Sequence, residues 1–181
     1  GNLPARSLGI AGRFTYAFMS KYLAEINFGY NGSENFPKEN RFGFFPSLSL
    51  GWVITNEGFW KYEAINNLKL RGSYGKVGND QIGQRFLFVS RINRNAVGYR
   101  FGNSQQLWGG FAEDFIANPD VTWEIATKSN FGFDMGLLKN KIVLQFDAFY
   151  ETRNDILTQR RTVPRIAGIM NHVIPWGNIG K

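Results

Sequence analysis

Apolar and polar residues alternate one by one along two neighbouring segments near the start of the chain, residues 8–18 and 22–30. This spacing is typical of β-strands that have one apolar and one polar face. The apolar or small side chains of the two segments are Leu8, Ile10, Gly12, Phe14, Tyr16, Phe18, Tyr22, Ala24, Ile26, Phe28 and Tyr30. The intervening residues MSK predict a tight turn, and pairing about position 20 sets Phe14 opposite Ile26 and Arg13 opposite Asn27. The pattern therefore predicts a hairpin whose two apolar faces coincide.

The alternation continues in four further segments, which predict four further strands. They are residues 44–54, 68–76, 123–137 and 142–153. The first residue of the third segment, Trp123, falls on its apolar face. The turn LKNK joins the last two segments into a second hairpin, which sets Phe133 opposite Phe146 and Lys128 opposite Glu151. The second pair is expected to be an ion pair on the polar face.

The connections between the predicted strands tend to alternate in length. They run short (residues 19–21), longer (31–43), moderate (55–67), very long (77–122), short (138–141) and long (from 154). Long structureless loops are uncommon in compact soluble domains. Outer-membrane barrels, in contrast, have short turns at one end and long loops at the other, and strands of about 9–11 residues.

Aromatic residues gather at the ends of the predicted strands, as in the interfacial girdles of a membrane barrel. They are Tyr16, Phe18 and Tyr22 at the first turn, Tyr30, Phe44 and Phe45 beside the next long connection, and Trp52 near the following one. A soluble sheet with one buried face would explain the alternation of each strand equally well. The loop lengths and the aromatic positions favour the membrane barrel over the soluble sheet.

The composition fits one domain and excludes several kinds of site. A chain of 181 residues can bury one ordinary core, and its 16% aromatic residues and 21 glycines favour strands and turns. The absence of cysteine and the single histidine exclude disulfides, thiolate chemistry and multi-histidine zinc sites. A formal charge of +7 would suit nucleic acid, but the basic residues are scattered along the strands, so no nucleic-acid partner is expected.

Five consecutive blocks of the chain resemble the SusC/RagA family of TonB-dependent outer-membrane transporters. The blocks are LAEINFGYNGSENF, RFGFFPSLSLGWVITNEGFW, LKLRGSYGKVGND, ANPDVTWEIATKSNFGFDMGLL and FDAFYETRNDIL. The closing NIGK also matches, and in that family it opens another strand. The resemblance implies an all-β fold, an antiparallel transmembrane β-barrel segment of about six to seven strands from a larger, 22-stranded barrel. Residues 1–181 would be a partial barrel domain that lacks the plug domain, the TonB box and the C-terminal strands.

The same resemblance implies a function and a set of partners. Family members import oligosaccharides, sometimes peptides, through the outer membrane of Gram-negative bacteria. They work with a SusD-like surface lipoprotein that closes over the barrel, and the TonB complex supplies energy through an N-terminal region. We accordingly expect outer-membrane lipid around the barrel, an oligosaccharide or peptide substrate, and no cofactor, catalytic residue or metal site.

The connection 77–122 is the best candidate for contact with substrate or lid, and part of it is expected to form strands above the membrane. The side chains of Tyr99, Trp108 and Phe111 could stack on sugar rings. Hydrogen bonds to hydroxyl groups could come from Arg100, Glu113 and Asp114. The alternative is that these aromatic residues only pack the loop against its neighbours.

Two other readings of the polar residues are open at this point. Asp134, Asp147 and Glu151 share the polar face of one hairpin and could be imagined as the carboxylates of a glycosidase. No pocket is implied around them, so we expect no enzyme.

Arg160 and Arg161 could contact lipopolysaccharide phosphates or the lid, and the alternative, which we favour, is that they belong to a solvated loop. The alternative to an importer is a surface or soluble β-sandwich carbohydrate-binding module that uses the same aromatic residues.

Overall fold

The computed structural model describes residues 6–62, 64–83, 85–103, 105–160 and 174–181. These residues form ten strands and two short 3₁₀ helices, η1 (Lys38–Asn40) and η2 (Ile54–Asn56). No helix in the described ranges is long and apolar enough to cross a membrane.

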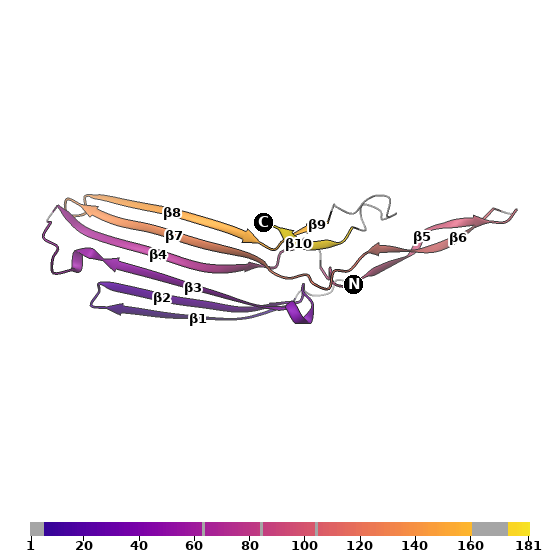
Figure 1. Ribbon diagram of the computed structural model, residues 1–181, viewed down its shortest axis with the longest axis horizontal. Coiled ribbons are helices and arrows are strands. Elements are labelled where there is room, and N and C mark those ends of the chain that lie inside the picture. Colours follow the sequence, from indigo (N-terminus) through magenta and orange to yellow (C-terminus); the bar gives the residue numbers. More distant parts are fainter. Residues whose placement is uncertain (1–5, 63, 84, 104, 161–173) are drawn as a thin grey trace.

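Six long strands form one antiparallel sheet in the order β1-β2-β3-β4-β7-β8 (Figure 1). Their bounds are Ser7–Phe18 (β1), Tyr22–Ser33 (β2), Phe42–Val53 (β3), Ile65–Asn79 (β4), Glu124–Leu137 (β7) and Ile142–Asn154 (β8). Each strand pairs with the next one along the chain, except that β5 and β6 are inserted between β4 and β7. At about 3.4 Å per residue, a strand of this length spans about 40 Å, which exceeds the hydrocarbon thickness of a bilayer.

The register of both predicted hairpins is confirmed. Phe14 lies opposite Ile26 in the first hairpin, and the Arg13 Nε donates to Asn27 Oδ1 at 2.9 Å. In the second hairpin Phe133 lies opposite Phe146, with ring centroids 5.6 Å apart. Because side chains alternate with period two, this register puts all the apolar faces on the same side of the sheet.

Successive connections of the main sheet lie at opposite ends, and the longest of them, between β4 and β7, lies at the end opposite the two tight turns (Figure 1). The tight turn of residues 19–21 has two residues with positive φ, Met19 at 51° and Ser20 at 53°, as in the primed turns that suit twisted hairpins. We call the end with residues 19–21, 54–62, 64 and 138–141 the turn end. The end with residues 34–41, 80–83, 85–90, 116–123, 155–160 and 174–180 is the loop end.

Two strand pairs stand beyond the loop end of the main sheet. β5 (Arg91–Phe101) and β6 (Gln106–Phe115) form a hairpin that projects away from the sheet (Figure 1). The expectation that part of the connection 77–122 forms strands is therefore confirmed. β9 (Ile156–Gln159) follows β8 after a kink at Asp155 (φ 59°) and pairs with β10 (Trp176–Gly180), which contains most of the predicted NIGK strand.

The buried core is small and lies at the loop end. Its fully or almost fully buried hydrophobic side chains are Phe36, Leu87, Val121 and Trp123. They come from three connections far apart in the sequence, and half-buried residues including Phe45 and Trp176 pack around them. This loop-end core joins the long connections to one another.

Two aromatic residues were wrongly assigned from the sequence. Trp123 precedes β7 and is 7% exposed, because its ring packs on Phe36 at 5.0 Å and on Phe45 at 5.2 Å between centroids. Phe45 belongs to the polar face of β3, whereas its neighbour Phe44 is 58% exposed on the apolar face. Neither residue contributes to an outward aromatic girdle, since both serve the loop-end core.

Candidate functional site

The apolar face of the sheet is exposed along its whole length. Phe14 is 64% exposed and Leu50 and Phe131 are each 55% exposed, although all three lie inside long strands. Exposed apolar patches of this extent mark a surface that contacts another apolar phase or a partner. The soluble-sheet interpretation required a covered face, and within the described ranges nothing covers it.

Aromatic rings border the apolar face at the turn end. Tyr22 lies between Phe18 and Trp52, with centroid distances of 6.5 and 6.4 Å and stacked planes. Rings with a polar edge prefer the boundary between an apolar and an aqueous phase. A second set of pairs, Tyr30–Phe42 at 5.1 Å and Phe28–Phe44 at 6.3 Å, borders the face toward the loop end.

The carboxylate of Glu57 lies beside the turn-end rings and joins two connections. It accepts hydrogen bonds from Lys21 Nζ at 3.0 Å and from Trp52 Nε1 at 3.1 Å. Hydrogen bonds from Tyr22, Lys21 and Trp52 hold the pKa of the Glu57 carboxyl below its ordinary value. Asn56 also donates to the Ser20 carbonyl oxygen at 2.8 Å, so the two neighbouring connections are fixed to each other.

Ion pairs run across the polar face of the sheet. Arg71 Nη2 lies 2.7 Å from Asp147 and 3.2 Å from Asp134, which joins β4, β7 and β8. Nearer the loop end, Glu151 pairs with Lys128 at 3.3 Å and with Arg153 at 2.7 Å. The ion pair predicted between Lys128 and Glu151 is thus confirmed.

The same contacts bear on the glycosidase reading of the polar face. Each of Asp134, Asp147 and Glu151 has a cationic partner within 3.3 Å. A general acid needs a carboxyl whose neutral form is favoured, usually by an apolar pocket or a second carboxylate. The three carboxylates instead lie in ion pairs on the polar face, an arrangement that suits a charged wall rather than acid–base chemistry.

One exposed aromatic residue on the polar face was missed by the sequence reasoning. Phe149 lies opposite Asn130 in the register, on the same face as Asp147 and Glu151, and is 82% exposed. The alternation of side chains would have placed Phe149 on the polar face, because Asp147 and Glu151 lie two residues before and after it. It was missed because the strand was assigned from its apolar residues at even positions.

The six residues predicted to bind substrate or lid all lie on the β5–β6 hairpin, but they do not form one cluster. Tyr99 lies directly opposite Trp108, so these two rings share a face. Arg100 lies opposite Leu107 on the other face, and the alternation of β6 puts Phe111 and Glu113 on the side of Leu107. The structure therefore divides the predicted set between two faces of the hairpin.

Two of the polar members of this set, Asp114 and Arg100, have partners within the hairpin. Asp114 lies 3.8 Å from Arg91, and Arg100 Nη1 donates to the Gln105 carbonyl oxygen at 3.2 Å. The aromatic members are more open: Tyr99 is 71%, Trp108 60% and Phe111 77% exposed. In the described part of the chain, no group of three or more acidic or histidine side chains could hold a metal ion.

Two asparagines that the sequence reasoning did not single out hold the loop end together. Asn118 donates from its amide to the Trp176 carbonyl oxygen at 2.7 Å. Asn178 accepts from the Thr122 backbone at 3.1 Å and donates back to its carbonyl oxygen at 2.9 Å. We call these contacts the asparagine clamps. Asn118 belongs to the family-like block that begins ANPDVTWE, and this resemblance was the signal in the sequence that could have pointed to its role.

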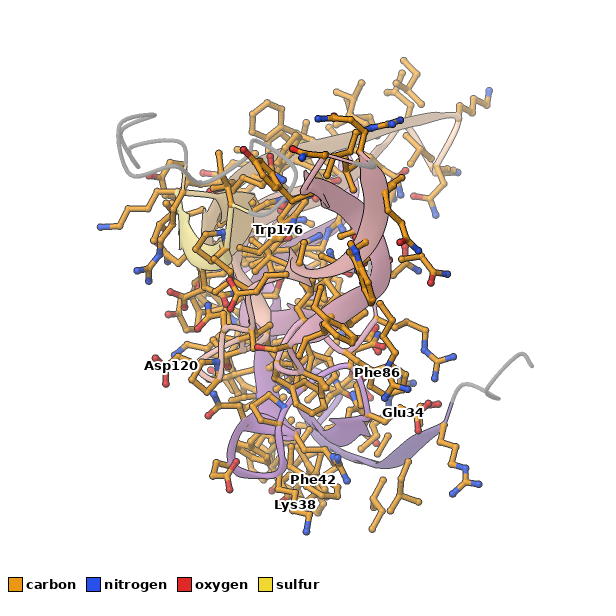
Figure 2. All side chains as sticks on the ribbon, turned by 90° about the vertical axis from the view of Figure 1, so that its right-hand side faces the viewer. Glu34, Lys38, Phe42, Phe86, Asp120 and Trp176 are labelled. Atoms are coloured by element: carbon orange, nitrogen blue, oxygen red, sulfur yellow. The ribbon has the colours of Figure 1, made fainter. Side chains whose placement is uncertain are left out.

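Figure 2 looks onto the loop end, where side chains from several connections meet. Glu34, from the connection after β2, pairs with Arg85 and accepts from the Arg6 backbone at 3.0 Å. Asp120 and Trp176 lie on the other side of this end in the same view. Arg160 directly follows β9 and donates its backbone N–H to the Pro175 carbonyl oxygen at 3.1 Å. Arg161 lies outside the described residues.

Comparison with known families and proteins gives a consistent result. Residues 2–181 match the family model described as TonB dependent receptor-like, beta-barrel. The TonB-dependent receptor SusC of Bacteroides thetaiotaomicron is 33% identical over 149 residues, which cover 81% of this chain and 15% of SusC. A TonB-dependent receptor of Formosa agariphila is 35% identical over 160 residues, which cover 88% of this chain and 14% of that protein.

Solved structures agree with this match. The RagAB peptide transporter superposes with a TM-score of 0.78 and 25% identity, over 96% of this chain and 18% of the transporter chain. The RagAB peptide importer in its open-open state superposes equally well. The chain thus spans about 15% of the length of the curated relatives and about 18% of the solved chains.

Proposed function

The chain belongs to the family of TonB-dependent receptor-like β-barrels, in its SusC/RagA branch, and on this premise we propose that it is a wall segment of an outer-membrane importer. The observation that carries the proposal is the six-stranded sheet with one exposed apolar face and one charged face. In a barrel of this kind the apolar face contacts lipid and the charged face lines the lumen. The segment is one partial barrel domain, residues 1–181.

The location of the protein is the outer membrane of a Gram-negative bacterium. The aromatic pairs at both ends of the apolar face support this location, because they suit the two membrane interfaces. The turn end faces the periplasm and the loop end faces the cell exterior, as the lengths of the connections favour. An open sheet edge is not tolerated in lipid, so β8 pairs with a further strand. The register of β10 with β9 directs the chain after Gly180 along β8.

The transport function involves parts that lie outside this chain. The substrate class is an oligosaccharide or a peptide; the peptide alternative is supported by the likeness to the RagAB peptide transporter. A SusD-like surface lipoprotein closes the barrel from outside, and the TonB complex supplies energy through an N-terminal region. This segment forms part of the barrel wall and takes no part in catalysis.

The β5–β6 hairpin is the part of the segment that contacts substrate or lid. It projects from the loop end (Figure 1), and both of its faces carry exposed aromatic rings. An isolated two-stranded hairpin is marginally stable in water, which supports a partner on it. The Tyr99–Trp108 face offers two rings for stacking on sugars or peptide side chains. The opposite face presents Arg100, Phe111 and Glu113 for contact with substrate or lid, and Asp114 lies beside Arg91.

The β-sandwich module is the weaker reading of the same sheet. A sandwich buries the apolar faces of two sheets against each other. The apolar side chains of this sheet are largely exposed, with values such as 64% for Ile10 and 55% for Leu50. A single sheet of this kind would aggregate in plain buffer instead of forming a soluble module.

Fractionation of cells that express the full-length protein tests this proposal. We expect the protein to sediment with outer membranes after a carbonate wash. We also expect it to migrate anomalously on denaturing gels unless the sample is boiled, because closed barrels resist unfolding by detergent. A protein that remains in the washed supernatant, or one whose mobility does not depend on boiling, would contradict the proposal.

A further inference from the structure

The apolar face contains one groove, near the turn end, that differs from the rest of the face. Its volume is about 420 Å³, and its lining is almost entirely apolar. The groove crosses β2, β3 and β4, with its floor at Ala24 and Gly72 and with Tyr16, Leu50 and Phe131 as its ridges. In the register, these five residues lie in one lateral row in which large and small side chains alternate.

The rim of the groove toward the turn end is amphipathic. Tyr22 and Trp52 line the groove with their rings and direct polar atoms toward Glu57, outside the strands. The groove floor lies two residues from this rim, or about 7 Å. A ligand in the groove would therefore have its apolar part among the rings and its polar part at the turn end.

The turn end carries an excess of positive charge. The sequence of residues 19–21, 54–64 and 138–141 contains four lysines, Lys21, Lys61, Lys139 and Lys141, against two glutamates, and of these lysines Lys21 is already paired with Glu57. Lysines close to a membrane surface attract anionic headgroups. The charge at this end therefore complements a phosphate group, and the apolar groove complements an acyl chain.

We propose that this groove binds one acyl chain of a glycerophospholipid whose phosphate headgroup lies among the lysines of the turn end. The inference rests on the proposed function, since the apolar face must face lipid. It goes beyond the general contact between a barrel and its membrane. A groove of defined shape retains one acyl chain for a longer time than a flat apolar surface does. A filled groove also restores the packing that its lining lacks when it is empty.

The chain offers a direct way to fill the groove and a matched control. A Cβ added at Gly72 would meet no atom closer than 3.9 Å, so Gly72→Leu introduces bulk without a backbone clash. Ala24→Leu fills the second hollow. Ala148→Leu is the control, because Ala148 lies opposite Phe131 in the same lateral row but does not line the groove.

The experiment uses the full-length protein, purified from outer membranes in a mild detergent and stripped of lipid. Dioleoyl phosphatidylglycerol is titrated in, and bound lipid is counted by native mass spectrometry. Dioleoylglycerol, which has the same chains and no phosphate, is the comparison ligand. We expect the double variant Ala24→Leu, Gly72→Leu to bind the phospholipid about tenfold more weakly than wild type. We expect the control to bind like wild type and dioleoylglycerol to bind more weakly at low salt.

Other results would overturn the inference. Equal phospholipid binding by wild type and the double variant would show that the groove holds no chain. An equal loss in the Ala148→Leu control would indicate a general change of the surface. A change of oligomeric state in the double variant without loss of lipid would assign the groove to a protein contact. Failure of the proposed function is distinct, because the wild-type protein would then lack membrane association and boiling-dependent mobility.

Discussion

At the scale of single residues, Glu57 holds the turn end together through side chains from two strands and a turn. Its contacts with Tyr22, Lys21 and Trp52 lower the pKa of its carboxyl below the ordinary 4.5. A group with a lowered pKa in the folded state stabilises that state at pH values above its ordinary pKa. This contribution is lost as the pH falls through the lowered value.

Glu57→Gln is therefore expected to lower the urea midpoint of unfolding at neutral pH and to reduce the fall of that midpoint in acid. The glutamine keeps one acceptor but loses the charge that favours Lys21. The measurement is the folded fraction from boiling-dependent gel mobility, at pH values from neutral to below 4. Glu39→Gln, at an exposed position at the loop end, is the control and should leave the midpoint unchanged. A Glu57→Gln protein with the wild-type pH profile would refute the role assigned to this carboxylate.

Arg71 is the second residue whose loss has a defined consequence. Arg71→Met leaves the carboxylates of Asp134 and Asp147 on the polar face without their shared cation. We expect a loss of about 1 kcal/mol in the free energy of unfolding, because the pairs are partly exposed. Adding Asp147→Asn to the Arg71→Met protein should recover part of this loss, and a double-mutant cycle measures the coupling. A coupling of zero would mean that the pair does not stabilise the wall.

At the scale of the strands, two neighbouring glycines differ in the space around them. A Cβ at Gly132 in β7 would lie 2.6 Å from the Phe146 carbonyl oxygen and 2.7 Å from Asp147 Oδ1. The carbonyl oxygen belongs to the ladder between β7 and β8 and cannot move without disturbing the hydrogen bonds there. Gly72 in β4 has open space instead.

Gly132→Ala is expected to destabilise the protein by about 1–3 kcal/mol through this overpacking. Gly72→Ala should stay within about 0.5 kcal/mol of wild type, since it removes no contact and creates no clash. Urea midpoints of both variants, measured side by side, test the register of β7 and β8. Equal stability of the two variants would mean that the close approach at Gly132 is absent.

The β5–β6 hairpin carries the prediction for transport. The double variant Tyr99→Ala, Trp108→Ala should reduce uptake of the cognate substrate at least about tenfold, if each ring contributes about 1 kcal/mol. Membrane content and boiling-dependent mobility should remain at wild-type levels, because the hairpin stands beyond the sheet. Val97→Ala, at a 98% exposed position on the same hairpin, is the control and should transport normally. Unchanged uptake in the double variant would remove this face from the binding surface.

The six long strands and two registers could be predicted because period-two alternation and turn position together leave one pairing. The strand ends could not, since residues such as Asn31–Ser33 and Val77–Asn79 do not continue the alternating pattern and are ordered by pairing with the neighbouring strand. The two faces of β5–β6 could not be separated either, because the register shifts between Asn93 and Ala96 and again before Tyr99. The loop-end core was missed for a third reason: its members are distant in sequence, and a face assignment does not reveal what covers the face.

At the scale of the whole molecule, the sheet is organised as a wall with one apolar face and one charged face. Its apolar face is bordered by aromatic rings at both ends, and its polar face carries ion pairs from β4 to β8. The loop-end core and the asparagine clamps fix the long connections over one rim. The wall and the loops are thus stabilised separately, the wall by strand pairing and ion pairs and the loops by a small buried core.

The central claim is that even-numbered residues of β2 face lipid and odd-numbered residues face the lumen. The most direct test places a nitroxide spin label, one position at a time, at residues 24–28 of the full-length protein in outer-membrane vesicles. Collision with oxygen, which concentrates in lipid, should be high at Ala24, Ile26 and Phe28 and low at Glu25 and Asn27. A polar relaxation agent should not show maxima at the even positions. Oxygen accessibility without this period, or high accessibility of the even positions to the polar agent, would contradict the assignment of the apolar face to the membrane.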